Sequence, residues 1–282
     1  MRKKWWLLGG CIALVALIIG TVTLTQMRKT NVRTAPATEN DVVQDDVSAT
    51  EIKTTKAWVK LKHPLKLPIL MYHSISSGNQ LCVPKKQAVA ELTYLKRHHY
   101  QTLTTAQAIR ALTTNTVPQK KVVWITLDDA YQDNRKLLPT LKKYRQHVTI
   151  NAITGFTHKS NHLSLAQMRS MKATGRVDFA SHTVQHLDLN ALTAAQQKQE
   201  LLASKQWLDT NLKQDTQMVC YPAGRANKTT HKLAKKAGYK LALTTQEGFA
   251  KLSEGRYNLS RLRVEPGIST ATFADLIAVT NS

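Results

Sequence analysis

Cysteine is scarce in this chain. The 282 residues contain three, and only Cys82 and Cys220 lie outside the apolar N-terminal segment. Two thiols are too few for the disulfide framework that small secreted domains use in place of a core. We therefore expect both to be unpaired and buried, with a single bridge between them as the alternative, and we expect the fold to depend on an ordinary hydrophobic core.

Acidic residues are also few, since 18 Asp and Glu stand against 40 Lys and Arg and leave a formal net charge of +22. The chain has no basic nucleic-acid-binding motif and no aromatic platform, so we exclude nucleic acid as a partner. Many lysines are spread over helical segments such as 228–240, a pattern typical of a solvated face. Outside a cell, a cationic surface would attract anionic envelope polymers or anionic lipid, and we keep such polymers as a partner hypothesis.

The sequence contains one long hydrophobic run, near its N-terminus. After Arg2, Lys3 and Lys4, no residue is charged from Trp5 to about Gln26, which is roughly the length of a membrane-spanning helix. The run lacks the small-residue cleavage site of a signal peptide. We predict an uncleaved transmembrane helix, so that residues 1–26 form a membrane anchor. The chain would be a single-pass protein of the cell membrane with its catalytic domain on the extracellular side.

The remainder divides into a tether and a domain. Residues 27–60 keep no helical or strand period and are predicted to be a flexible tether. From 61 to 282, short apolar runs alternate with amphipathic segments. We expect strands at 67–72, 122–127, 148–153, 177–180, 218–221 and 239–243, and helices at 85–98, 134–146, 164–173, 192–212 and 227–237. The alternation predicts an α/β fold, a parallel sheet or barrel with helices outside, and about 220 residues suit one barrel.

Polar residues gather at the expected carboxyl ends of these strands, where such folds collect their functional groups. His73 follows the first strand, Asp128 and Asp129 follow the second, His182 follows the fourth, and the segment 222–225 follows the fifth. This convergence predicts a single active site.

Two of these groups form a potential metal site. Asp128 and Asp129 are adjacent, and adjacent acids repel unless a cation or a proton neutralises them. About fifty residues later come His182 and His186. One carboxylate and two imidazoles are a common ligand set for a hydrolytic metal that keeps an open coordination position. The other carboxylate would then be free to act as a base.

Other polar residues receive plainer interpretations. His158 and His162 share the same i, i+4 spacing but have no adjacent carboxylate, so we do not expect them to bind metal. Asp133 precedes an amphipathic run and is predicted to cap that helix.

Four motifs together resemble the polysaccharide deacetylase family, also called the NodB-homology family or carbohydrate esterase family 4. The first two are Thr-Leu-Asp-Asp-Ala at 126–130 and His-Thr-Val-Gln-His at 182–186. Leu-Pro-Ile-Leu-Met-Tyr-His at 67–73 and Tyr-Pro-Ala-Gly-Arg-Ala-Asn at 221–227 are similar to the branch that deacetylates poly-β-1,6-N-acetylglucosamine. The resemblance covers residues 64–282 and implies a distorted (β/α) barrel of the NodB-homology type.

The resemblance also implies roles for single residues. One divalent metal ion, expected to be Zn²⁺, would be held by Asp129, His182 and His186. Asp128 would be the general base that accepts a proton from the attacking water. His73, whose ordinary pKa lies near neutrality, would be the general acid that protonates the departing amine.

The resemblance implies roles for two further residues. Some positions differ from the family's usual residues. The backbone N–H of Ala223 would stabilise the oxyanion, and Arg261 would orient Asp128, with a plain structural salt bridge as the alternative. Ala130 replaces the usual Gly, which strains the turn if it requires a positive φ. Cys220 replaces an arginine, and Ala223 replaces a tyrosine that would form a wall of the sugar cleft.

The expected function is metal-dependent removal of N-acetyl groups from an extracellular N-acetylglucosamine polymer. The motif at 67–73 favours poly-β-1,6-N-acetylglucosamine, and peptidoglycan is the alternative substrate. A different class also stays open, a membrane-tethered carbohydrate-binding module whose site has degenerated at Ala130 and Ala223.

Overall fold

The computed structural model of this chain describes residues 57–279. The predicted membrane anchor and most of the predicted tether lie outside these residues. Within 57–279, no helix has the length and apolar character needed to cross a membrane. Residues Val59–Lys60, at the end of the range predicted as a tether, form strand β1, which pairs antiparallel with β4 (Thr116–Val117).

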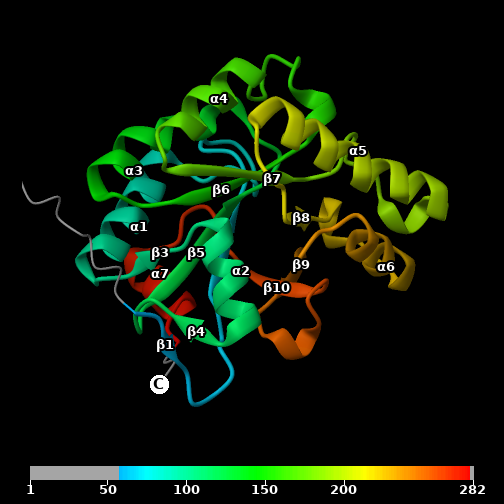
Figure 1. Cartoon of the computed structure of the whole chain (residues 1–282). Coiled ribbons are helices and arrows are strands. Elements are labelled where there is room, and N and C mark those ends of the chain that lie inside the picture. Colours follow the sequence, from blue (N-terminus) through cyan, green and yellow to red (C-terminus); the bar gives the residue numbers. More distant parts are fainter. Residues whose placement is uncertain (1–56, 280–282) are drawn as a thin grey trace, which may run out of the picture. The chain divides into compact units, whose positions relative to one another are not determined.

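Seven parallel strands close into a barrel (Figure 1), which confirms the predicted fold class. Their order around the barrel is β2 (Ile69–Tyr72), β10 (Leu259–Arg263), β9 (Leu241–Glu247), β8 (Met218–Cys220), β7 (Val177–Ser181), β6 (Val148–Ala152) and β5 (Val122–Leu127). Closure occurs because β2 pairs with β10 on one side and with β5 on the other, with Leu70 opposite Ile125. The short β3 (Gln101–Thr102) adds to the free side of β5.

Helices cover the outside of the barrel (Figure 1). They are α1 (Lys85–Arg97), α2 (Thr105–Thr114), α3 (Leu138–Tyr144), α4 (Leu165–Ala173), α5 (Ala194–Leu212), α6 (Lys228–Lys236) and α7 (Thr270–Leu276). Short 3₁₀ turns occur at η1 (Gln132–Leu137), η2 (Thr154–Phe156), η3 (Leu189–Ala191), η4 (Pro222–Gly224) and η5 (Leu252–Glu254). Capping boxes begin α2, α4, α5 and α6, because a polar side chain in each accepts a hydrogen bond from the third backbone N–H.

The helix prediction missed α2 and α7 and was wrong in two further details. The segment predicted as one helix over 134–146 consists of η1 followed by α3. Asp133 is not the N-cap, a position that Tyr131 holds without a side-chain hydrogen bond. Instead, the Asp133 carboxylate accepts hydrogen bonds from the Ser74 hydroxyl and the Ile75 N–H, so it holds the loop after β2.

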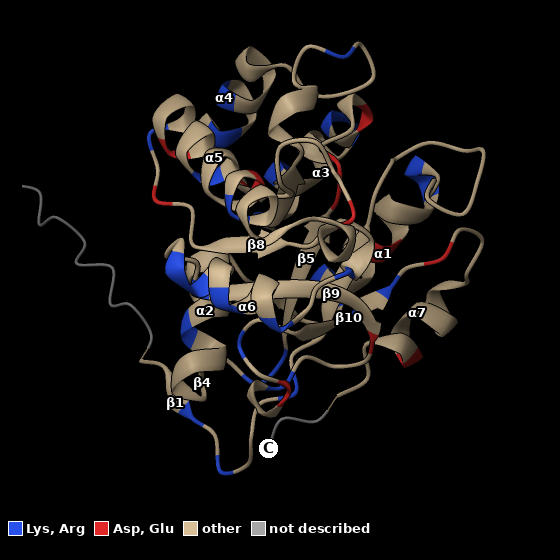
Figure 2. Cartoon of the chain, turned by 90° about the vertical axis from the view of Figure 1, so that its right-hand side faces the viewer, with Lys and Arg blue, Asp and Glu red and all other residues tan. Residues whose placement is uncertain are grey.

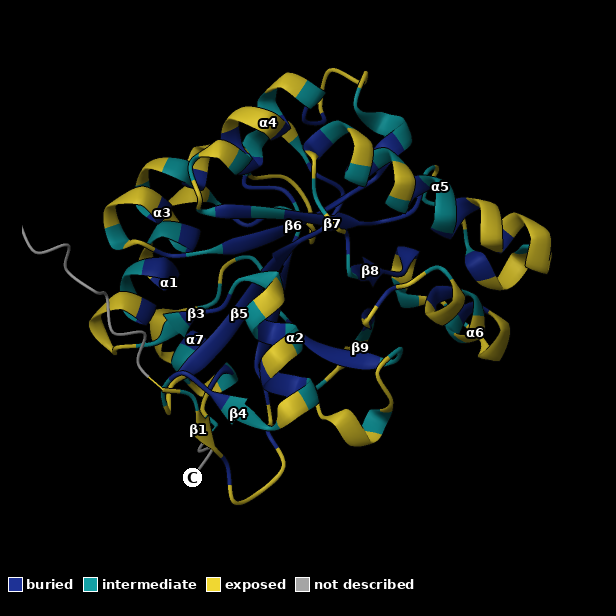
Figure 3. Cartoon of the chain, viewed as in Figure 1, coloured by how far each residue is buried: buried dark blue, intermediate teal, exposed yellow. Residues whose placement is uncertain are grey.

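Alternate residues of the strands face two different apolar clusters, as the period of two of a β-strand requires. Ile69 and Trp124 belong to the cluster that includes α2, whereas Leu70 and Ile125 pack with α1, α3 and α4. All six residues of β5 are buried, and Figure 3 shows the strands dark against exposed helix faces. This two-sided burial explains why the strands are continuous apolar runs in the sequence.

The carboxyl end of β2 is attached to α1 by a buried polar contact. The Tyr72 hydroxyl donates to Glu91 Oε2 at 2.8 Å, and Gln87 Nε2 donates to Glu91 Oε1 at 2.9 Å. Glu91 is only 2% exposed. Burial raises the pKa of Glu91 to about 7, although these two hydrogen bonds act in the opposite direction.

Because the pKa of Glu91 is raised in the folded state, folding favours the protonated carboxyl. The resulting stabilisation is complete below the unfolded-state pKa and is lost as pH rises through about 7. We expect Glu91→Gln to gain about 3 kcal/mol in unfolding free energy relative to the native chain as pH rises from about 4 to about 8. Urea unfolding at both pH values measures this difference. An identical pH dependence in the two proteins would contradict the account.

Candidate active site

The structure brings the candidate residues together at one end of the barrel. His73 follows β2, Asp128 and Asp129 follow β5, and His182 follows β7. Ala223 lies in η4 after β8. The sequence placed these residues at the carboxyl ends of separate strands, and the parallel barrel puts all of these ends on the same side.

Asp129, His182 and His186 form a group with the geometry of an open metal site. Nε2 of His182 lies 3.4 Å from Asp129 Oδ1, and Nε2 of His186 lies 3.6 Å from the same oxygen. That oxygen is buried and has no hydrogen-bond partner within residues 57–279. A buried carboxylate oxygen without a donor is costly, and a divalent cation between these three atoms would satisfy it. The donor set therefore fits a metal such as Zn²⁺.

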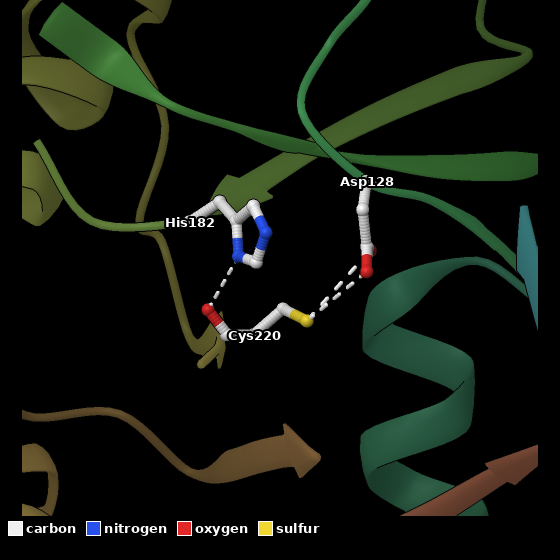
Figure 4. A group of neighbouring side chains, drawn as sticks. All are labelled: Asp128, His182 and Cys220. Carbon is white, nitrogen blue, oxygen red and sulfur yellow. Dashed lines mark hydrogen bonds between the residues drawn. The ribbon is translucent and has the colours of Figure 1, made fainter. Parts of the chain in front are cut away.

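A hydrogen bond to the backbone fixes the orientation of the His182 ring. Its Nδ1–H donates to the Cys220 carbonyl at 2.7 Å (Figure 4). This leaves Nε2 to face Asp129. Metal-binding histidines commonly use their second nitrogen in this way, because the hydrogen bond sets the tautomer and the ring direction. His182 is 2% exposed, whereas His186 is partly exposed and closes the outer side of the group.

Asp128 has a different environment from its neighbour. Its Oδ1 accepts from Arg261 Nη1 at 2.9 Å and from Asn151 Nδ2 at 2.7 Å, and its Oδ2 accepts from Arg261 Nη2 at 2.7 Å. Burial alone would raise the pKa of this carboxyl, but the Arg261 guanidinium holds that pKa far below its ordinary value. Asp128 is therefore an anion that is already paired, whereas Asp129 keeps a free oxygen.

Arg261 is fully buried and connects several strands. Besides Asp128, it donates from Nε to the Thr244 carbonyl on β9 at 2.7 Å and from Nη1 to the Thr126 hydroxyl on β5 at 3.0 Å. The two parallel N–H bonds to Asp128 form the bidentate geometry that only a planar guanidinium offers. These contacts fix the direction of the Asp128 carboxylate.

His73 lies on the open side of Asp128. Its Nε2 is 3.8 Å from Asp128 Oδ2, and its side chain is 14% exposed. Burial lowers the pKa of His73, while the charges of Asp128 and Asp129 act in the opposite direction. The imidazole thus shares a space with both carboxylates and remains accessible from solution.

The turns that carry these groups are strained. Asp129 has φ 71° and Ala130 has φ 57°, so the turn does require a left-handed backbone where Ala130 replaces glycine. The Ala130 methyl is buried, and its burial offsets part of the conformational cost of roughly 1 kcal/mol. Ala223 also has φ 50°. No hydrogen bond within the described residues uses its N–H, which is therefore available to a bound oxygen.

Cys220 occupies the space beside Asp128. Its Sγ lies 3.7 Å from each carboxylate oxygen (Figure 4). Burial raises the pKa of this thiol. Asp128, His182 and Cys220 form a second possible ligand group, but both Asp128 oxygens already bond to Arg261. Cys82 and Cys220 are both free thiols, as expected, although Cys82 is only half-buried.

Sequence reasoning missed three contributors. Asn151 orients Asp128, and its signal was a lone amide within the apolar strand β6. Cys220 supplies both the thiol and the carbonyl described above, and no pattern in the sequence indicated either contact. Glu200 on α5 accepts from the N–H groups of Val184 and Gln185 and so supports the loop between the two histidines. His158 and His162 belong to neither of these two ligand groups.

Comparison with known proteins agrees with this geometry. The family model described as polysaccharide deacetylase matches residues 115–242. The YxkH protein of Bacillus subtilis is 41% identical over 273 residues, which is 96% of each chain. The poly-β-1,6-N-acetyl-D-glucosamine N-deacetylase of Staphylococcus epidermidis is 30% identical over 225 residues, covering 73% of this chain and 76% of its own.

Solved structures show the same relationship. The Streptococcus pyogenes deacetylase PplD, solved with acetate, superimposes with a TM-score of 0.73 at 36% identity, over 77% of this chain and 100% of its own. A polysaccharide deacetylase from Bacillus cereus gives a TM-score of 0.69 at 25% identity, over 76% of this chain and 70% of its own. With the barrel, the ligand group and the paired aspartates in common with that family's motifs, this chain belongs to the polysaccharide deacetylase family.

Proposed function

We propose that this polysaccharide deacetylase removes N-acetyl groups from an extracellular N-acetylglucosamine polymer, poly-β-1,6-N-acetylglucosamine in particular. The observation that carries the proposal is the pair of unlike aspartates: Asp129 faces His182 and His186 with an unpaired oxygen, while Asp128 is held as an anion beside His73. The 30% identity with the Staphylococcus epidermidis enzyme supports the choice of polymer.

Asp129, His182 and His186 would hold one divalent ion, which we propose to be Zn²⁺ because a carboxylate with two imidazoles suits that metal. A divalent ion there supplies Lewis acidity to the acetamide carbonyl and to the attacking water. Because His182 Nδ1–H donates to the Cys220 carbonyl, Nε2 is the nitrogen that His182 would offer to the ion.

The remaining residues would transfer protons and stabilise the negative charge that develops on the acetamide oxygen. Asp128 accepts a proton from the attacking water, while the water oxygen forms a bond to the acetamide carbon. The Ala223 N–H donates to the oxygen that gains negative charge. His73 then gives a proton to the nitrogen as the C–N bond breaks, so that acetate and an amine leave. Arg261 would keep Asp128 directed at the water throughout, because two hydrogen bonds fix the carboxylate.

The location of this activity is a proposal as well. We propose that residues 1–26 anchor the chain in the cell membrane and place the catalytic domain outside. The support is the uncharged run after Lys4 in the sequence.

Metal content should follow the ligand group. We expect the purified full chain to carry about one divalent ion, and His182→Ala or His186→Ala to remove it, because each supplies one of three protein ligands. His162→Ala is the matched control, since that imidazole lies outside the group. Elemental analysis measures the outcome. Full occupancy in both ligand variants would show that the metal is held elsewhere.

Mutation should distinguish the proposed base, Asp128, from the proposed metal ligand, Asp129. Asp128→Asn should keep the metal yet lower acetate release by roughly 10²–10⁴-fold, because an amide cannot accept the proton. Asp129→Asn should lose the metal itself. Acetate release from poly-β-1,6-N-acetylglucosamine and from peptidoglycan, with circular dichroism to confirm folding, tests both statements. Wild-type rates in Asp128→Asn would refute the assignment of the base.

His73→Ala should lower kcat by roughly 10²–10⁴-fold without changing metal content, because the imidazole donates a proton and binds no metal. The basic limb of the pH–rate profile should vanish with it, since that limb reports deprotonation of the acid. A basic limb that persists in the variant would mean that another group protonates the amine.

A further inference from the structure

A cationic groove adjoins the candidate active site. It is lined by Gln132, Asp133, Arg135, Lys136, Leu138, Pro139 and Lys142, and we call it the η1–α3 groove; its volume is about 820 Å³. Three of these side chains are cations and one is an acid. Arg135, Lys136 and Lys142 are all exposed, and none forms a salt bridge among the described residues.

The one acid of the groove is already engaged. Asp133 accepts from the Ser74 hydroxyl with Oδ2 and from the Ile75 N–H with Oδ1 at 2.8 Å. Lys136 Nζ donates to the Ile75 carbonyl at 2.9 Å. Two groove residues thus hold the backbone that immediately follows His73. The groove is therefore in direct contact with the loop that carries the candidate acid into the site.

The charge of this groove discriminates between substrates. Deacetylation converts neutral acetamides into amines, which are positive once protonated. A groove with three cations repels a chain that gains positive charge, and a neutral stretch of polymer gains no charge attraction from it. A negative group on the substrate would be attracted by the guanidinium and ammonium groups.

We propose that the η1–α3 groove is a subsite for an anionic group, a phosphate or a carboxylate, carried by the glycan substrate next to the sugar being deacetylated. The inference rests on the proposed function and narrows the substrate to forms of the N-acetylglucosamine polymer that carry a negative substituent or a negative end group.

A second cationic surface provides a control. Lys228, Lys232, Lys235 and Lys236 are exposed on one face of α6, where Figure 2 shows the blue bands of that helix. This face has four cations, whereas the groove has three cations and one acid. It differs because none of its four lysines lines the groove or contacts the His73 loop among the described hydrogen bonds.

The test compares two double variants of the full chain with equal loss of charge. Arg135→Gln/Lys142→Gln alters the groove and spares Lys136, which supports the Ile75 backbone. Lys232→Gln/Lys236→Gln alters the α6 face. The probes are a neutral tetramer of β-1,6-linked N-acetylglucosamine, the same tetramer with one terminal 6-phosphate, and the same tetramer ending in a uronic acid.

We expect the groove variant to raise KM for a charged tetramer about tenfold, with kcat unchanged and the neutral tetramer unaffected. The α6 variant should change neither value. Which charged tetramer shows the effect distinguishes phosphate from carboxylate. Equal KM values for charged and neutral tetramers in the native chain would overturn the proposal. Equal changes of KM in the groove variant and the α6 variant would also overturn the proposal, because they would indicate long-range attraction by the protein's net charge.

Equilibrium binding of the same tetramers separates this inference from the proposed function. If no tetramer releases acetate but the native chain binds a charged one about tenfold tighter than the groove variant does, the proposed function fails and the subsite stands. If acetate is released and binding shows no preference for charge, the subsite alone fails.

Discussion

The arrangement of the site depends on the buried ion pair between Arg261 and Asp128. Neither group is exposed, and removing two charges from water costs several kcal/mol per ion unless hydrogen bonds replace the lost solvation. Here they do, since Arg261 also donates to Thr126 and Thr244, and Asp128 also accepts from Asn151. The pair therefore connects β5, β6, β9 and β10 at the point where the barrel opens. It also gives two adjacent aspartates different surroundings, because Asp128 is paired with a guanidinium whereas Asp129 faces two imidazoles.

This division follows from position on the turn after β5. Asp129 has a positive φ, which directs its carboxylate toward the two histidines and away from Arg261. Under the proposed mechanism, the free oxygen of Asp129 would bind a cation and Asp128 would accept a proton. Groups with the same side chain are thus suited to separate tasks by their surroundings, a general device of acid–base enzymes. The left-handed turn is built with Ala130 rather than glycine, and the buried methyl explains how that residue is accommodated.

Much of the barrel could be predicted from the sequence because its strands are buried on both sides and form continuous apolar runs. The predicted bounds of β5 match the structure, and α1, α4, α5 and α6 begin within two residues of their predicted starts. β10 was missed because Leu-Ser-Arg-Leu-Arg has no apolar run, and its polarity exists to place Arg261 inside the barrel. The ligand spacing indicated His182 and His186 together with one of the two adjacent aspartates, and the choice of Asp129 came from the family resemblance. Roles for His73 and Arg261 came only through the family resemblance, and contacts such as Cys220 with Asp128 depend on packing between strands far apart in sequence.

The central claim is that the metal belongs to Asp129 and its two histidines while Asp128 stays paired with Arg261. Anomalous diffraction from crystals of the chain grown with Zn²⁺ tests it most directly. The account predicts one peak at roughly 2.0–2.2 Å from an Asp129 oxygen and from Nε2 of both histidines, with the Arg261–Asp128 bonds intact. A peak at roughly 2.3 Å from Cys220 Sγ, with Asp128 turned away from Arg261, would contradict it.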